Sequence, residues 1–120
     1  MTTPVTYVEL NSPDLEATTS FMRDVFGWEP QPFAAPDYLV APHGDGPGID
    51  AGLLSSRDGN PRTVPIIRVD SLDALRARIQ SAGGSIVVEP FTFPGVGRGC
   101  YLTDPAGLLI GLHEHDLNAR

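Results

Sequence analysis

The sequence predicts an α+β fold: two βαβββ modules form one curved, eight-stranded mixed sheet with helices on the convex side. The first observation is a repeat, because three positions recur at an offset of about 57 residues: Leu15 as Leu72, Met22 as Ile79 and Gly27 as Gly84. The second is that each half opens with a short strand followed by an amphipathic helix. The third is the polar stretch "SSRDGNPRT" between the halves. We therefore place module 1 at about 4–56 and module 2 at about 62–116 of a single domain, 1–120.

The first half begins with "VTYVEL", residues 5–10, whose alternation is typical of a strand. "NSPDLEATTSFMRDVFG" then predicts a helix with Ser12 as its cap and Gly27 as its stop. Thr18 and Thr19 interrupt the apolar stripe of that helix. Three short strands are expected between Trp28 and Leu54, including "DYLVA" and "DAGLL".

The second half repeats this order. "VPIIRVDSLDALRARIQSAGG" predicts a strand and then a helix that is capped by Ser71 or Asp70 and ends at Gly83 and Gly84. "SIVVEP", "GRGCYLT" and "LLIGLHE" are expected to be the last three strands. Cys100 lies in one of them without a CxxC partner, so we interpret it as a small buried residue.

Charge and composition exclude several classes of function. The chain has 8 Lys and Arg against 15 Asp and Glu, a net charge of −7, and no basic stripe for nucleic acid. The start "MTTPVTYVELNSPD" has neither a basic n-region nor an apolar run, and no stretch approaches the roughly 18 apolar residues of a membrane span. We expect a cytoplasmic protein with no nucleic-acid or membrane partner.

Alternation along the strands divides the candidate site residues between two faces of the sheet. In the first strand, Tyr7 and Glu9 share the face away from the helices. In the last strand, Leu108, Ile110 and Leu112 are expected on the helix side. The concave face then carries the following second-half residues: Ile66, Arg68, Tyr101, Leu109, Gly111 and His113. Aromatic and aliphatic side chains with a few polar groups are what a small-molecule site requires.

Four stretches of the chain resemble the vicinal oxygen chelate superfamily, the group of glyoxalases, bleomycin resistance proteins and extradiol dioxygenases. They are "DLEATTSFMRDVFGWEP", "VDSLDALRARIQSAGGSIVVEP", "PGVGRGCYLTDPAG" and the terminal "LLIGLHE". The resemblance covers nearly the whole chain in the family's order. It implies paired βαβββ modules, a homodimer and a small-molecule cavity in the concave face of the sheet.

Metal-dependent members of this superfamily take one ligand from each of four strands. By the resemblance, these positions fall here on Tyr7, near Asp50, on Val64 and on Gly111. Val64 and Gly111 have no donor side chain, and divalent ions of this kind prefer His and carboxylate to Tyr. We therefore expect the usual metal site to be missing and no cofactor to be needed. A divalent metal held elsewhere remains the alternative.

Glu9 and His113 are the strongest candidates for chemistry. They lie one strand repeat beyond two of the lost ligand positions and could act as a base and acid pair, or as ligands of a displaced metal. The alternative is structural: Glu9 forms an ion pair with Arg68, and His113 is a half-exposed residue at a strand end. Arg98, in "GVGRG", is a candidate for an anionic substrate group, and Trp28 for the core or the cavity wall.

The sequence therefore predicts a protein that binds a small apolar or aromatic molecule in the concave sheet without the usual metal. The competing hypothesis is an enzyme of the same fold, a lyase, isomerase or oxygenase, that works through Glu9 and His113. A third hypothesis is a structural or partner-binding module with a closed concave face. The architecture alone does not separate them, because one fold hosts unrelated chemistries.

Overall fold

The computed structural model describes residues 2–33 and 35–120 and divides the chain into two compact units. The first unit is Thr6–Val64, and the second is Pro65–Arg120 with the start of the chain up to Val5. The order strand, helix, three strands occurs twice along the chain. Eight strands with both parallel and antiparallel pairing and two helices confirm the predicted α+β class and its two βαβββ modules.

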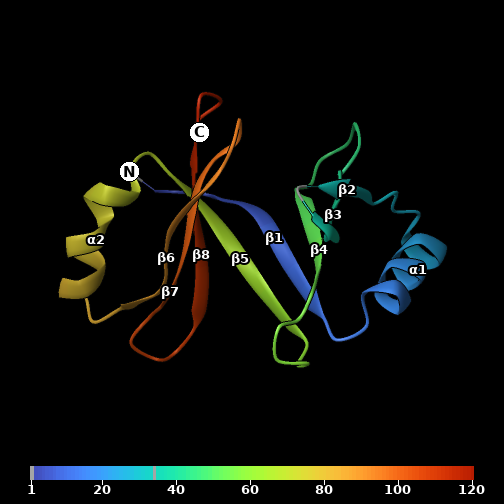
Figure 1. The fold of residues 1–120 in the computed structure, drawn as a ribbon, viewed down its shortest axis with the longest axis horizontal. Helices are drawn as coiled ribbons and strands as arrows, with labels where there is room; N and C mark the ends of the chain where they lie inside the picture. Colours follow the sequence, from blue (N-terminus) through green and yellow to red (C-terminus); the bar gives the residue numbers. More distant parts are fainter. Residues whose placement is uncertain (1, 34) are drawn as a thin grey trace. The chain divides into compact units, whose positions relative to one another are not determined.

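The first unit contains one helix and a four-stranded half-sheet (Figure 1). Its elements are β1 (Val5–Ser12), α1 (Leu15–Phe26), β2 (Gln31–Phe33), β3 (Ala35–Ala41) and β4 (Asp50–Ser55). The strand order is β2-β3-β4-β1, with β1 parallel to β4 and the other neighbours antiparallel. Leu53 on β4 has no exposed surface and lies at the centre of the unit's core.

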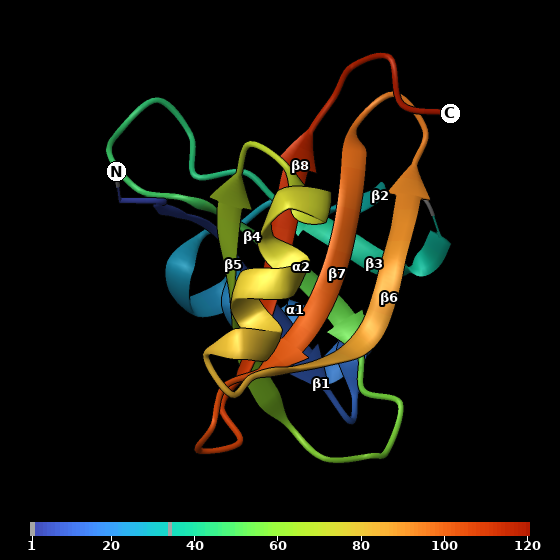
Figure 2. The ribbon, with the colours of Figure 1, turned by 90° about the vertical axis from the view of Figure 1, so that its left-hand side faces the viewer.

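The second unit repeats this arrangement. Its elements are β5 (Arg62–Val69), which begins at the end of the first unit, α2 (Leu72–Ser81), β6 (Ser85–Phe93), β7 (Gly97–Thr103) and β8 (Leu109–His115). The strand order is β5-β8-β7-β6, with β5 parallel to β8. Helix α2 covers one face of this half-sheet (Figure 2). Within the described residues, no helix is long and apolar enough to cross a membrane.

Helix α1 begins two residues later than its sequence predicts. Its N-cap is Asp14, whose carboxylate accepts a hydrogen bond from the Ala17 N–H at 3.1 Å, so the expected cap at Ser12 is wrong. The Ser12 hydroxyl instead accepts from the Asp14 N–H and pairs with the Thr18 hydroxyl at 2.6 Å. This polar contact explains the interruption of the apolar stripe at Thr18. The predicted stop at Gly27 is confirmed, in the left-handed conformation that glycine favours.

Helix α2 is capped from two directions. Ser71, one of its two predicted caps, accepts a hydrogen bond from the Ala74 N–H at 3.2 Å. The Glu114 carboxylate on β8 accepts from the Leu72 N–H at 3.0 Å. Both contacts satisfy backbone donors that a helix start leaves without partners. The second contact also ties the start of α2 to β8, on the helix side of the half-sheet.

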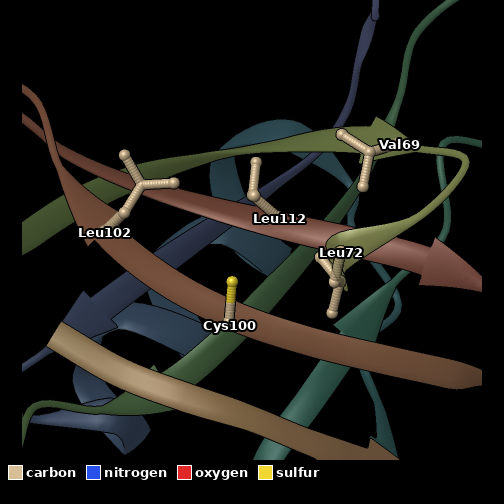
Figure 3. Packing of buried hydrophobic residues seen from close by; sticks show 5 residues of the cluster. All are labelled: Val69, Leu72, Cys100, Leu102 and Leu112. Atoms are coloured by element: carbon tan, nitrogen blue, oxygen red, sulfur yellow. The ribbon is translucent and has the colours of Figure 1, made fainter. Parts of the chain in front are cut away.

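A compact apolar cluster fixes α2 on the second half-sheet (Figure 3). Its buried members are Val69, Leu72, Cys100, Leu102 and Leu112. Cys100 is 3% exposed, as its sequence context predicts, and burial raises the pKa of its thiol. The prediction for Leu108 is wrong, because this residue precedes β8 and is 58% exposed.

Candidate functional site

In the first unit, strand register places three polar side chains on the face away from the core. Directly paired residues of neighbouring strands point to the same face. The pairs Tyr7 with Asp50, Glu9 with Gly52, and Tyr38 with Leu54 lie on the face opposite Leu53, because side chains alternate along β4. The predicted common orientation of Tyr7 and Glu9 is therefore confirmed, and Tyr38 joins them from β3.

These three side chains form a hydrogen-bonded chain, which we call the phenol chain: Glu9, Tyr38 and Tyr7. The Tyr38 hydroxyl donates to Glu9 Oε2 at 2.6 Å, a short charge-assisted contact. The hydroxyls of Tyr7 and Tyr38 lie 2.9 Å apart. Glu9 is only 6% exposed, so its carboxylate is buried as part of this network. Hydrogen bonding of this kind is what makes a buried carboxylate tolerable.

Gly52 provides the space in which the two phenols meet. A Cβ at this position would lie 2.6 Å from the hydroxyl oxygens of both Tyr7 and Tyr38, closer than such atoms approach. Burial is the largest cause that raises the pKa of Tyr7, to about 12, and the nearby Glu9 carboxylate adds to it. Burial and Glu9 also raise the pKa of Tyr38. Both phenols therefore keep their protons at neutral pH.

In the second unit, register brings most of the predicted site residues to one face. Gly111 pairs with Ile66 on one side and Tyr101 on the other, and His113 pairs with Arg68 and Gly99. Leu112, between them in sequence, points to α2 and belongs to the buried cluster. The alternation predicted for the last strand is confirmed from Leu109 to His113.

An aromatic platform lies on this face, formed by Phe91, Phe93 and Tyr101. The Phe91 and Tyr101 rings are stacked with centroids 6.0 Å apart and an interplanar angle of 22°. The Phe93 ring meets Phe91 edge-on at 5.2 Å. Glycines make room for these rings: a Cβ at Gly99 would lie 3.1 Å from the Phe91 ring, and one at Gly111 would lie 3.1 Å from Tyr101.

Sequence reasoning missed Tyr38, Phe91 and Phe93. The expected strand "SIVVEP" stops at residue 90, whereas β6 continues to Phe93 despite Pro90. The alternating aromatic residues of "FTF" were the available signal, since period-two aromatics are typical of one face of a strand. Tyr38 offered no comparable signal, because its place beside Glu9 depends on how β3, β4 and β1 pair.

His113 lies beside the platform and is half-buried. Its ring centroid is 5.9 Å from that of His115, and a Cβ at Gly97 would lie 3.0 Å from its Cε1. Burial lowers the pKa of His113 first, and the positive charges of His115 and Arg68 lower it further. The neutral imidazole is therefore the form that the folded second unit favours.

This lowered pKa predicts how stability changes with acidity. The unfolded chain takes up a proton at His113 at a higher pH than the folded chain does. The contribution of His113 to the free energy of unfolding is therefore fully present above the ordinary histidine pKa of about 6.5, and it is lost as the pH falls through the lower pKa of the folded chain. We expect the urea midpoint to fall between pH 7.5 and pH 5, and to fall less in His113→Asn. Parallel curves for the two proteins would contradict this assignment.

The remaining predicted residues take different places. Arg98 lies on the helix side, where its guanidinium is 3.5 Å from Asp73 and 3.7 Å from Glu114. It is one residue out of phase with Gly97 and Gly99, and its role towards an anionic substrate group stays a prediction. Trp28 follows the end of α1 and is half-buried, and its role as a cavity wall stays a prediction.

Glu9 and His113 belong to different units, Glu9 to the first and His113 to the second. Their action as an acid and base pair therefore stays a prediction. The alternative ion pair of Glu9 with Arg68 also stays a prediction, for the same reason. The structure describes the surroundings of each residue within its own unit. The Glu9 carboxylate accepts a hydrogen bond from the Tyr38 hydroxyl, and His113 is a neutral imidazole beside the aromatic platform.

By the resemblance, the family's four ligand positions fall on Tyr7, near Asp50, on Val64 and on Gly111, and Val64 and Gly111 have no donor side chain for a divalent metal. The space above Gly111 is occupied by Ile66 and Tyr101, so no donor side chain can project there. Asp50 Oδ1 accepts a hydrogen bond from the His43 N–H at 3.0 Å. In residues 2–33 and 35–120, no three His, Cys, Asp or Glu side chains are grouped to hold a metal ion.

Comparison with known proteins identifies relatives. "Putative glyoxylase CFP32" of Mycobacterium tuberculosis is 29% identical over 117 residues, which cover 90% of this chain and 44% of that protein. The crystal structure of the Mn(II)-bound glyoxalase from Novosphingobium aromaticivorans matches with a TM-score of 0.68 and 28% identity, over 98% of this chain and 41% of that one. The chain thus spans less than half the length of both relatives.

A third similarity concerns the fold alone. Methylmalonyl-CoA epimerase from Mycobacterium tuberculosis matches with a TM-score of 0.65 and 21% identity, over 92% of this chain and 87% of that one. The family model described as the Glyoxalase/Bleomycin resistance protein/Dioxygenase superfamily matches residues 5–112, nearly the whole chain. This chain therefore belongs to the Glyoxalase/Bleomycin resistance protein/Dioxygenase superfamily.

Proposed function

We propose that this protein binds a small apolar or aromatic molecule on the aromatic platform, without the divalent metal that the family's ligand positions would hold. The observation that carries the proposal is the stacked pair of Phe91 and Tyr101 on the face that α2 does not cover. A planar ligand extends such a stack with favourable offset geometry. Arg68, exposed on the same face beside His113, supplies a polar group for orientation.

Titration with 2-methoxynaphthalene, an apolar aromatic probe, tests this proposal. Tyr101→Ala should weaken binding at least tenfold, about 1.4 kcal/mol, because an aromatic pair contributes about 0.5–1.5 kcal/mol beyond the area it buries. Tyr101→Phe keeps the ring and should bind within about threefold of wild type. Affinity should not change when a chelator is added.

The matched control is Leu117→Ala, because Leu117 is 70% exposed and lies outside the platform. Thermal unfolding of each variant separates loss of binding from loss of folding. Equal affinity of wild type and Tyr101→Ala would sink the proposal. Binding that disappears with the chelator and returns with added metal would instead establish a metal-dependent site.

A second candidate function is an enzyme that uses Glu9 for acid–base chemistry. The observation in its favour is the phenol chain, which places a buried carboxylate in a short hydrogen bond with Tyr38. A network of this kind holds a base in one orientation. His113, kept neutral in the second unit, is the partner that the sequence suggests. Equal turnover of a substrate by wild type and Glu9→Gln would exclude this role.

We also propose that two copies of the chain associate. Apolar side chains of α1 support this, because Phe21, Val25 and Phe26 are 56%, 56% and 60% exposed. Clustered exposed apolar groups mark interaction surfaces more often than free surface. Light scattering at micromolar concentration should give the mass of a dimer, and Phe21→Glu should shift it towards the monomer. A monomeric wild type would contradict the proposal.

A further inference from the structure

The direction of the phenol chain follows from counting its protons. A phenol has one proton to donate and also accepts hydrogen bonds, whereas an ionised carboxylate only accepts. Tyr38 gives its single proton to Glu9 Oε2. The 2.9 Å contact between the two hydroxyls must then have Tyr7 as its donor and Tyr38 as its acceptor. The chain therefore runs from Tyr7 through Tyr38 to Glu9.

This direction decides what the Tyr7 oxygen can offer to a ligand. Its proton is committed to Tyr38, so only acceptor capacity remains at the open end of the chain. Tyr7 is half-buried, so the residue at this end of the chain is not closed off from solvent. A ligand hydroxyl can donate to this oxygen, whereas an ether or ketone oxygen would face a group with no proton to give.

The surroundings of the chain suit a phenolic ligand. The Phe33 ring packs beside Tyr38 with centroids 5.8 Å apart and supplies an aromatic contact in the same unit. Leu54 and Val40 pair with Tyr38 and Gly52 and so share the face of the phenol chain. Gly52 leaves room for the two hydroxyls to meet, since the Cβ of any other residue would lie 2.6 Å from both oxygens.

We propose that the phenol chain is a recognition site for the hydroxyl group of a small phenolic molecule, with the Tyr7 oxygen as the hydrogen-bond acceptor. Glu9 and Tyr38 are positioning residues, because they act on the ligand only by fixing the direction in which Tyr7 donates. This site lies within the first unit and does not depend on the aromatic platform. It goes beyond the proposed function as a separate site that prefers ligands with a hydrogen-bond donor.

Two probes of nearly the same shape test the proposal, 2-naphthol and its methyl ether, 2-methoxynaphthalene. One hydrogen bond contributes about 1 kcal/mol, so the affinity that the Tyr7 13Cζ chemical shift reports should be about fivefold higher for the naphthol in wild type. Tyr38→Phe frees the Tyr7 proton, which can then be donated to the ether oxygen, and the preference should fall below about twofold. Tyr7→Phe removes the acceptor and should abolish the preference.

Glu9→Gln gives a second, independent test. Its amide can donate to Tyr38 as well as accept from it, so the chain no longer has a fixed direction and the preference should weaken. Chemical shifts of 13Cζ-labelled tyrosine report whether the naphthol contacts Tyr7 in each variant, and thermal unfolding reports whether each variant is folded. Tyr7→Phe and Tyr38→Phe remove only a hydroxyl and keep the ring, so they disrupt the phenol chain with the least change in packing.

The outcomes are distinct from those of the platform test. Tyr101→Ala should lower the affinity for the methyl ether and leave the Tyr7 chemical shift response to naphthol in place. A naphthol preference that survives in Tyr38→Phe would overturn the inference. Equal binding of the two probes by wild type, or no response of Tyr7 to naphthol up to its solubility limit, would overturn it as well.

Discussion

Gly97→Ala should destabilise the protein by about 3 kcal/mol or more, the largest single effect expected in the second unit. Gly97 has φ +152°, a conformation that L side chains rarely adopt. A Cβ there would collide with the Glu114 carbonyl oxygen, a backbone atom that cannot turn away, and would lie 3.0 Å from the His113 ring. Backbone strain and overpacking therefore add at one position.

Urea unfolding of Gly97→Ala against wild type measures this effect. Gly46→Ala is the matched control, because a Cβ at Gly46 would meet nothing within 4 Å, and its stability should stay within about 0.5 kcal/mol of wild type. The probe affinity of folded Gly97→Ala should also fall, since His113 and the start of β7 must move. A loss below about 1 kcal/mol would mean that β7 and β8 can separate at little cost.

Much of the fold was predictable because local patterns determine it. Strand alternation correctly assigned Ile110 and Leu112 to the helix side and Gly111 and His113 to the other face. The repeat of strand, helix and three strands gave the element order in both halves. These features depend on neighbouring residues in the sequence, so they can be determined without knowing which strands pair.

The phenol chain could not be predicted in the same way. Tyr38 and Glu9 are 29 residues apart, and they meet only because β4 pairs with β3 on one side and β1 on the other. A shift of one residue in the pairing of β3 with β4 would turn Tyr38 to the helix side, and the same shift between β4 and β1 would turn Glu9 away from Tyr38. Residue alternation gives the face of each side chain within its own strand, but register decides which side chains meet.

Arg98 shows how alternation assigns a side chain to one face of a strand. "GRGCYLT" was expected to be a strand, and β7 does begin at Gly97, so alternation governs Arg98. Its side chain therefore follows Cys100 and Leu102 to the α2 face, where Asp73 and Glu114 are its ion-pair partners.

Leu53→Ala should cost about 2 to 5 kcal/mol of stability, the largest effect expected in the first unit. Leu53 has no exposed surface, and its neighbours Leu10 and Leu39 pair with it across β1 and β3. Truncation leaves a cavity in the core that backs β4. Because Leu53 follows Gly52 on the opposite face, the same change tests whether the core holds the phenol chain in register.

Urea unfolding and the naphthol preference should be measured together on Leu53→Ala. The exposed Leu117→Ala is the control, with a change of at most about 0.5 kcal/mol expected. If the folded variant loses stability but keeps the wild-type preference, strand pairing alone positions Tyr7, Tyr38 and Glu9. If the preference falls as well, packing behind β4 is part of what positions them. Unchanged stability would contradict the central place of Leu53 in this core.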